Sequence, residues 1–133
     1  PKAIWLVADM AYPATNIPAM AGADCLNTTQ TYPQKTRWEM LDQEGECEDI
    51  YNRYCHIRAS LGSKTMLELV STDYVEVTLS PEDLKKLNIR YIVSTNDFDE
   101  KIAARTTNIF TDSGIEFQKY YEGTQLSIYG CVY

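Results

Sequence analysis

The side chains best suited to chemistry gather in one short stretch, Asn52-Arg53-Tyr54, with His56 two positions later. The guanidinium of Arg53 is a planar fork of donors that can clamp a phosphate through two hydrogen bonds. The rings of Tyr54 and Trp38 can stack on the face of a sugar, because sugars are usually held by aromatic faces with a few polar groups beside them. In the competing interpretation, Arg53 pairs with the acidic residues at 46, 48 or 49, and Tyr54 belongs to the core.

A second candidate is Asp9, which directly follows the apolar run at residues 3–8. Polar groups at the ends of sheet strands often face ligands, although a helix cap or a loop hydrogen bond is the commoner role of such an aspartate. The loop at residues 10–31 shows no sustained period, and loops of this length are usually functional or flexible. We therefore expect this loop, Trp38 and residues 52–56 to converge on a ligand groove.

Nucleophilic and phosphate-loop chemistry find little support in the sequence. His56 is the single histidine, so a serine or cysteine nucleophile would have to recruit it, and no G-x-S-x-G elbow occurs. The six glycines never fall into a dinucleotide-binding or Walker spacing. A glycosidase-like carboxylate pair stays open among the 19 acidic residues.

The cysteines argue against a metal centre. Cys25, Cys47, Cys55 and Cys131 show no CxxC or CxxH spacing, so we expect no metal and no cofactor. We interpret them as buried free thiols. If the compartment is oxidising, Cys47 with Cys55 is the alternative, and a bridge between them requires a break in any helix that joins them.

Length, composition and charge limit the class of protein. The chain has 133 residues and 15.2 kDa, which fits one domain, and 44% hydrophobic residues suffice for a core. Its net charge of -7 repels a phosphate backbone, which excludes nucleic acid as a partner. The longest apolar run is far shorter than the roughly 20 residues of a membrane-spanning helix. Because the sequence opens at Pro1 and stops within a strand-like run, we expect residues 1–133 to be a single domain excised from a larger protein.

The elements that must position these residues follow from periodicity and turn signals. Strands are predicted at 3–8 and 89–93, in a β-meander at 56–61, 65–70 and 74–79, and in a C-terminal hairpin at 115–121 and 126–132. Short helices are predicted at 34–42, 48–54, 81–87 and 97–105. Ser80 and Pro81 form a helix start, and Asn88 tolerates the left-handed end. The predicted class is α+β, with a mixed, largely antiparallel sheet packed against several short helices.

Several segments together form a recognisable pattern: Tyr32-Pro33 leading to Trp38, residues 50–54 running into His56-Ile57, residues 84–94 (LKKLNIRYIVS), residues 114–117 and residues 126–129. They resemble the membrane-distal soluble part of YfhO-type bacterial multi-pass membrane proteins, which are glycosyltransferase-like and use lipid-linked sugars. The resemblance implies an extracytoplasmic domain at the bacterial cytoplasmic membrane, with the membrane-embedded helices of its own parent chain as partners. The family's presumed catalytic acids lie between transmembrane helices, so no catalytic residue is carried over.

We therefore expect a non-catalytic extracytoplasmic domain of a membrane glycosyltransferase-like protein that assists recognition of a cell-envelope glycan or lipid-linked sugar. Two alternatives stay open: a stand-alone soluble carbohydrate-active hydrolase or esterase, and a purely structural interaction module. The candidate ligand-binding residues are Asp9, Trp38, Asn52, Arg53, Tyr54 and His56.

Overall fold

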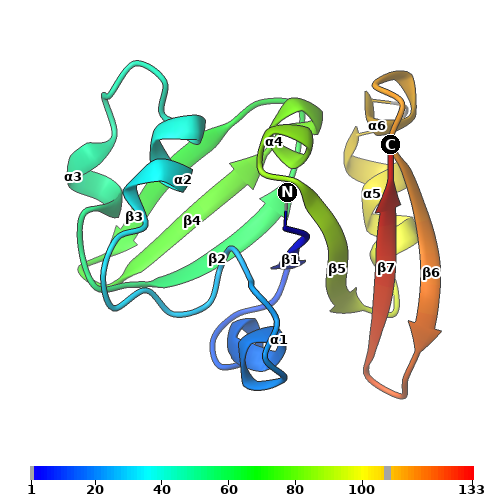
Figure 1. Cartoon of the computed structure of the whole chain (residues 1–133). Coiled ribbons are helices and arrows are strands. Elements are labelled where there is room, and N and C mark those ends of the chain that lie inside the picture. Colours follow the sequence, from blue (N-terminus) through cyan, green and yellow to red (C-terminus); the bar gives the residue numbers. More distant parts are fainter. Residues whose placement is uncertain (1, 107–108) are drawn as a thin grey trace.

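The computed structural model describes residues 2–106 and 109–133 and contains two mixed sheets flanked by short helices (Figure 1). The four-stranded sheet has the order β1 (Ile4–Val7), β5 (Ile89–Thr95), β7 (Leu126–Val132), β6 (Glu116–Glu122). The three-stranded sheet has the order β2 (His56–Leu61), β4 (Tyr74–Leu79), β3 (Met66–Ser71). The α+β class and the C-terminal hairpin, β6 with β7, are confirmed.

The helices are short throughout the described part of the chain. They are a 3-10 turn at Ala14–Asn16, α1 (Ile17–Met20), α2 (Lys35–Leu41), α3 (Glu48–Tyr51), α4 (Pro81–Lys86), α5 (Phe98–Thr106) and α6 (Ile109–Asp112). None of them has the length and apolar character needed to cross a membrane.

The predicted β-meander is wrong in its pairing, although its three strands are present. Strand β4 lies between the other two, parallel to β2 and antiparallel to β3. The turn after β2 passes the end of β4 so closely that a Cβ on Gly62 would lie 2.7 Å from the Thr78 side chain. A two-residue period assigns side chains to faces but does not choose the neighbouring strand. The buried positions of β4, in contrast with the exposed β3, are consistent with its central place.

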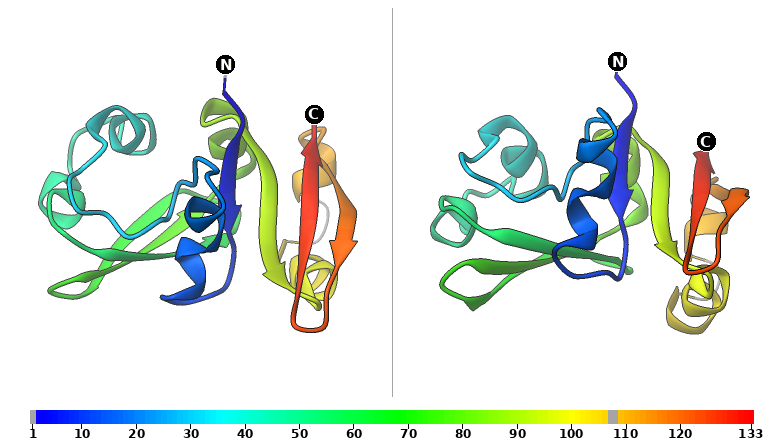
Figure 2. Two further views of the ribbon diagram at one scale, coloured as in Figure 1. Left: turned by 60° about the horizontal axis from the view of Figure 1, so that its bottom comes forward. Right: turned by 90° about the horizontal axis from the view of Figure 1, so that it is seen from below.

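Strand β1 connects the two sheets. One edge of β1 pairs in parallel with β5, and the other edge meets the long loop and β2 (Figure 2). Trp5 N–H donates to Asp24 O at 2.8 Å, and Asp9 N–H donates to Ala59 O at 2.8 Å. The larger of two core clusters therefore runs through both sheets and includes Leu6 and Ile57, and a smaller one contains Val7, Cys25 and Val93.

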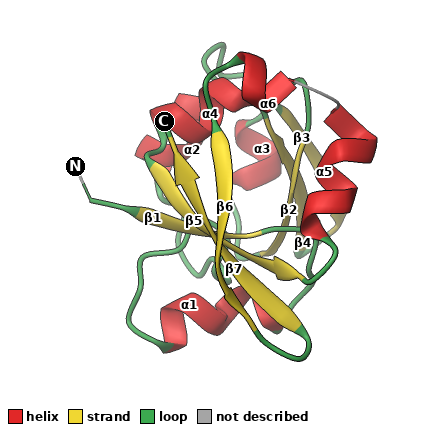
Figure 3. Ribbon diagram, turned by 90° about the vertical axis from the view of Figure 1, so that its right-hand side faces the viewer, coloured by secondary structure: helices red, strands yellow, loops and turns green. Residues whose placement is uncertain are grey.

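Helices α5 and α6 lie beside the four-stranded sheet (Figure 3). The ring of Phe98 packs 4.7 Å from that of Tyr129 and 5.4 Å from that of Phe117, measured between centroids. The expected capping at α4 is confirmed: Asp83 N–H donates to Ser80 Oγ, and Ser80 N–H donates to an Asp83 carboxylate oxygen. Asn88 then adopts a φ of 55°, the left-handed conformation expected there.

Candidate functional site

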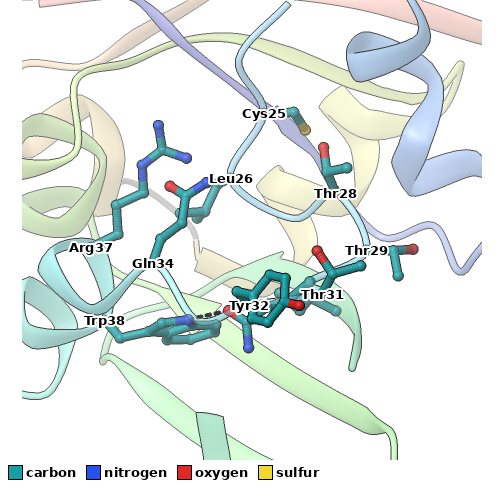
Figure 4. A pocket seen from close by; sticks show the side chains of 11 residues that line it. Cys25, Leu26, Thr28, Thr29, Thr31, Tyr32, Gln34, Arg37 and Trp38 are labelled. Atoms are coloured by element: carbon teal, nitrogen blue, oxygen red, sulfur yellow. Dashed lines mark hydrogen bonds between the residues drawn. The ribbon is translucent and has the colours of Figure 1, made fainter. Parts of the chain in front are cut away.

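A cavity of about 130 Å³ lies between the long loop and helix α2 (Figure 4). Its lining includes the hydroxyls of Thr28, Thr29 and Thr31 and the amides of Gln30 and Gln34. These groups are neutral and offer both donors and acceptors. The cavity therefore suits a ligand that is rich in hydroxyl groups.

Asn27 holds the loop wall of this cavity in place. Its fully buried amide accepts a hydrogen bond from Val7 N–H at 3.0 Å and donates to Val7 O at 2.8 Å and to Ile57 O at 3.3 Å. The side chain thus occupies the gap between β1 and β2 and satisfies strand groups on both sides. Sequence analysis did not single out Asn27, because its partners lie 20 and 30 residues away.

Gln30 fixes the same loop against β2 and α2. Its backbone exchanges hydrogen bonds with Cys55 at 2.8 and 3.0 Å. Its side-chain oxygen accepts from Trp38 Nε1 at 2.6 Å, and its side-chain nitrogen donates to Tyr51 O and Arg53 O, both at 2.7 Å. A mostly buried amide with this many partners is a structural connector rather than a free ligand group.

Trp38 lines the cavity, but its ring is packed inside the protein. The indole is 5% exposed and stacks on Tyr51 at a centroid distance of 5.1 Å and an interplanar angle of 4°. One ring face is therefore covered by Tyr51, and the indole N–H is taken by Gln30. The stacking role expected for Trp38 has to be supplied by other rings.

The guanidinium of Arg53 is occupied by main-chain oxygens. It donates to Ile50 O at 3.0 Å, to Asp49 O at 2.6 Å and to Thr72 O at 3.0 Å. These contacts tie the end of α3 to the turn between β3 and β4. Arg53 does not line the cavity, and its contact with Asp49 is to the backbone rather than to the carboxylate.

His56 lies in a group of aromatic side chains next to Thr29, outside the cavity lining. Its ring centroid is 4.1 Å from that of Tyr12 and 5.6 Å from that of Tyr54, and we call these three residues the ring cluster. Tyr12 and Tyr54 are about half exposed, at 50% and 51%. Thr29 joins the ring cluster to the cavity, because its hydroxyl lies 3.0 Å from His56 Nδ1 and the residue also lines the cavity.

The remaining sequence candidates lie elsewhere. Asp9 is 7% exposed, has a φ of 60° and lies at the end of β1, outside the cavity lining. Asn52 is exposed just after α3 and is likewise absent from the lining. The loop and Trp38 therefore meet at the cavity, and His56 reaches it only through Thr29, whereas Asn52 and Arg53 lie apart from the cavity. Tyr12 was not named as a candidate from the sequence. Only its place in the loop at residues 10–31 connected it with the predicted groove.

The charged and ionisable groups around the cavity are largely compensated. Arg37 donates to an Asp24 carboxylate oxygen at 2.6 Å. Burial raises the pKa of the Cys25 thiol, although hydrogen bonds from its neighbours act in the opposite direction, so the thiol is neutral at pH 7. All four cysteines are free thiols in the structure. The described residues contain no group of three or more His, Cys, Asp or Glu side chains that would hold a metal ion.

The structure is a small α+β fold with a cavity lined mainly by hydroxyl and amide side chains, and Thr29 links this cavity to the ring cluster. Comparison with protein-family models gives a match over residues 1–133 to the family described as "Domain of unknown function (DUF7654)", and the chain belongs to this family. Searches of curated proteins and of solved structures give no match.

Proposed function

We propose that this chain is a non-catalytic saccharide-recognition domain. The observation that carries the proposal is the ring cluster beside the hydroxyl-lined cavity, with Thr29 shared between them. The exposed rings supply stacking area, and the threonine hydroxyls and the Gln34 amide supply hydrogen bonds that fix orientation. A cavity of about 130 Å³ accommodates part of one sugar residue, so the rest of a glycan would extend over the ring cluster.

We further propose an extracytoplasmic location, on a bacterial membrane protein of glycosyltransferase-like type. This part of the proposal rests on the sequence resemblance carried by residues 84–94 and by the closing strand. The partners in this arrangement are the parent chain's membrane-embedded helices and a cell-envelope glycan or lipid-linked sugar. The domain's role is to bind the sugar portion, and turnover belongs to the parent protein.

A saccharide titration followed by two-dimensional NMR tests the binding role. Addition of neutral mono- and oligosaccharides at millimolar concentration is expected to shift the signals of Thr29 and His56. Tyr12→Ala and Tyr54→Ala should each weaken binding several-fold, because each removes a stacking face. Tyr121→Ala is the matched control, since Tyr121 is similarly exposed at 57% but lies on β6. Absence of any shift would favour a purely structural module.

One observation favours the hydrolase or esterase alternative. The Thr29 hydroxyl and the His56 imidazole are 3.0 Å apart, which is the distance between a nucleophile and its base. Within residues 2–106 and 109–133, however, no carboxylate hydrogen-bonds this imidazole to orient it. Turnover of aryl esters or aryl glycosides that is lost in His56→Ala would replace the recognition proposal with this one.

A further inference from the structure

A second pocket, of about 400 Å³, adjoins the cavity and differs from it in charge. Gln34 and Arg37 line both spaces. Four basic side chains line the second pocket: Lys2, Lys35, Arg37 and Lys86. Among the described residues that line it, none is acidic.

This gathering of cations runs against the overall charge of the chain. The chain carries 12 basic and 19 acidic residues, and a third of the basic ones meet at this pocket. Asp24 partly compensates them, through Arg37 at 2.6 Å and Lys2 at 3.9 Å. Lys35 and Lys86 are exposed and also border neighbouring pockets that contain acidic side chains. Within its own lining and the Asp24 carboxylate that pairs with it, the pocket therefore has four cations against one anion.

The pocket also has an apolar side. Ile4 and Leu87 are buried beneath it, and Met40 is 41% exposed at its edge. Lysine and arginine are the residues that proteins use to bind phosphoryl groups, and an apolar wall accommodates an organic ester.

We propose that this pocket is a binding site for a phosphoryl anion, free or esterified. The proposal goes beyond the saccharide-recognition role, because it uses none of the residues of the ring cluster. Combined with the proposed saccharide role, on which this last step rests, the shared Gln34 and Arg37 would let one phosphorylated sugar reach both the pocket and the hydroxyl-lined cavity.

Isothermal titration calorimetry with the whole chain tests the site. Three probes are used at constant ionic strength: inorganic phosphate, inorganic pyrophosphate and glucose 1-phosphate. Lys35→Gln and Lys86→Gln should each weaken binding by about two- to five-fold, the effect of one exposed ion pair. Lys64→Gln is the matched control, because it removes the same charge from the exposed turn between β2 and β3.

The outcomes separate cleanly. Binding that depends on Lys35 and Lys86 but not on Lys64 supports the site. Tighter binding of glucose 1-phosphate than of phosphate then identifies an ester as the ligand, and equal binding identifies the free anion. No binding of any probe at millimolar concentration, or equal loss in the Lys64→Gln variant, overturns the proposal. These results do not depend on Tyr12 or Tyr54, so failure of the saccharide titration is a separate result.

Discussion

Two regions of this protein are held in place in different ways. Residues 24–55, called the cavity wall because they include every lining residue except Ile57, contrast with residues 80–95, the α4–β5 unit. In the α4–β5 unit, Ser80 and Asp83 cap each other across three residues, and Asn88 turns the chain. In the cavity wall, the amides of Asn27 and Gln30 bond to backbone groups 20 to 30 residues away. The ends of α4 are therefore fixed by neighbours in sequence, although β5 itself pairs with the distant strands β1 and β7, whereas the side chains that hold the cavity wall bond to distant residues.

The difference explains how a mostly irregular segment forms a binding wall. A loop with no repeating backbone hydrogen bonds must satisfy its polar groups through side chains or water. Asn27 and Gln30 supply side-chain partners from inside the protein, and the residues Thr28, Thr29 and Thr31 line the cavity. The cavity wall is therefore expected to depend on a few side chains far more than the α4–β5 unit does.

Asn27→Ala is expected to give the largest loss of stability. The variant removes four hydrogen bonds, one of them from the Cys25 thiol, and leaves strand groups of Val7 and Ile57 buried without partners. The free energy of unfolding should fall by about 3 kcal/mol, measured by denaturant titration. Asn52→Ala is the control, since Asn52 is exposed, and it should change stability little. A loss below about 1 kcal/mol for Asn27→Ala would remove the contrast between the two regions.

Arg53→Ala should lower the free energy of unfolding by about 2 kcal/mol, because three main-chain oxygens lose a charged hydrogen-bond donor. Two of the three contacts are exposed to solvent, which limits the loss. Saccharide binding per folded molecule should be nearly unchanged, since Arg53 lies outside the cavity. Arg53→Lys keeps the charge but not the planar fork, so it should recover only part of the loss. A variant that keeps its melting temperature and loses ligand binding would restore the clamp role expected from the sequence.

Ser80→Ala should lower the free energy of unfolding by about 1 kcal/mol, the usual effect of losing an N-cap side chain. The loss should be confined to α4, because Asp83 and Pro81 remain in place. Hydrogen exchange of the first turn of α4 measures this directly, and Ser63→Ala in an exposed turn is the control. Faster exchange spread into residues 24–55 would mean that the two regions are not independent.

Thiol labelling tests whether the two regions open independently, and it is expected to show the smallest effect. Burial raises the pKa of Cys55 to about 11 and that of Cys131 to about 12, so both are protonated and unreactive at pH 8. Cys47 is only half-buried and should react first, while denatured protein should show four thiols. Asn27→Ala should speed the labelling of Cys55, which contacts the loop, and leave Cys131 on β7 unaffected. Equal acceleration of both would indicate one cooperative unit.

The sequence determined the elements whose signals are local. The strands at β5, β6 and β7, the capped start of α4 and the left-handed Asn88 follow from alternation, turn residues and capping chemistry within a few positions. The same local patterns placed a helix at α2 and the three strands after residue 55. Each of these needs only neighbours in the chain, which a sequence displays.

Tertiary structure alone decided the strand order and the cavity. The placement of β4 between β2 and β3 depends on how the chain crosses the end of β4, and side-chain alternation is the same in either order. The involvement of Arg53 with backbone oxygens, the covering of Trp38 by Tyr51 and the approach of Tyr12 to His56 all join residues distant in sequence or separated by a turn. Residue types revealed what these side chains are able to do, and only packing determined which partner each one meets, because that choice is made by long-range contacts.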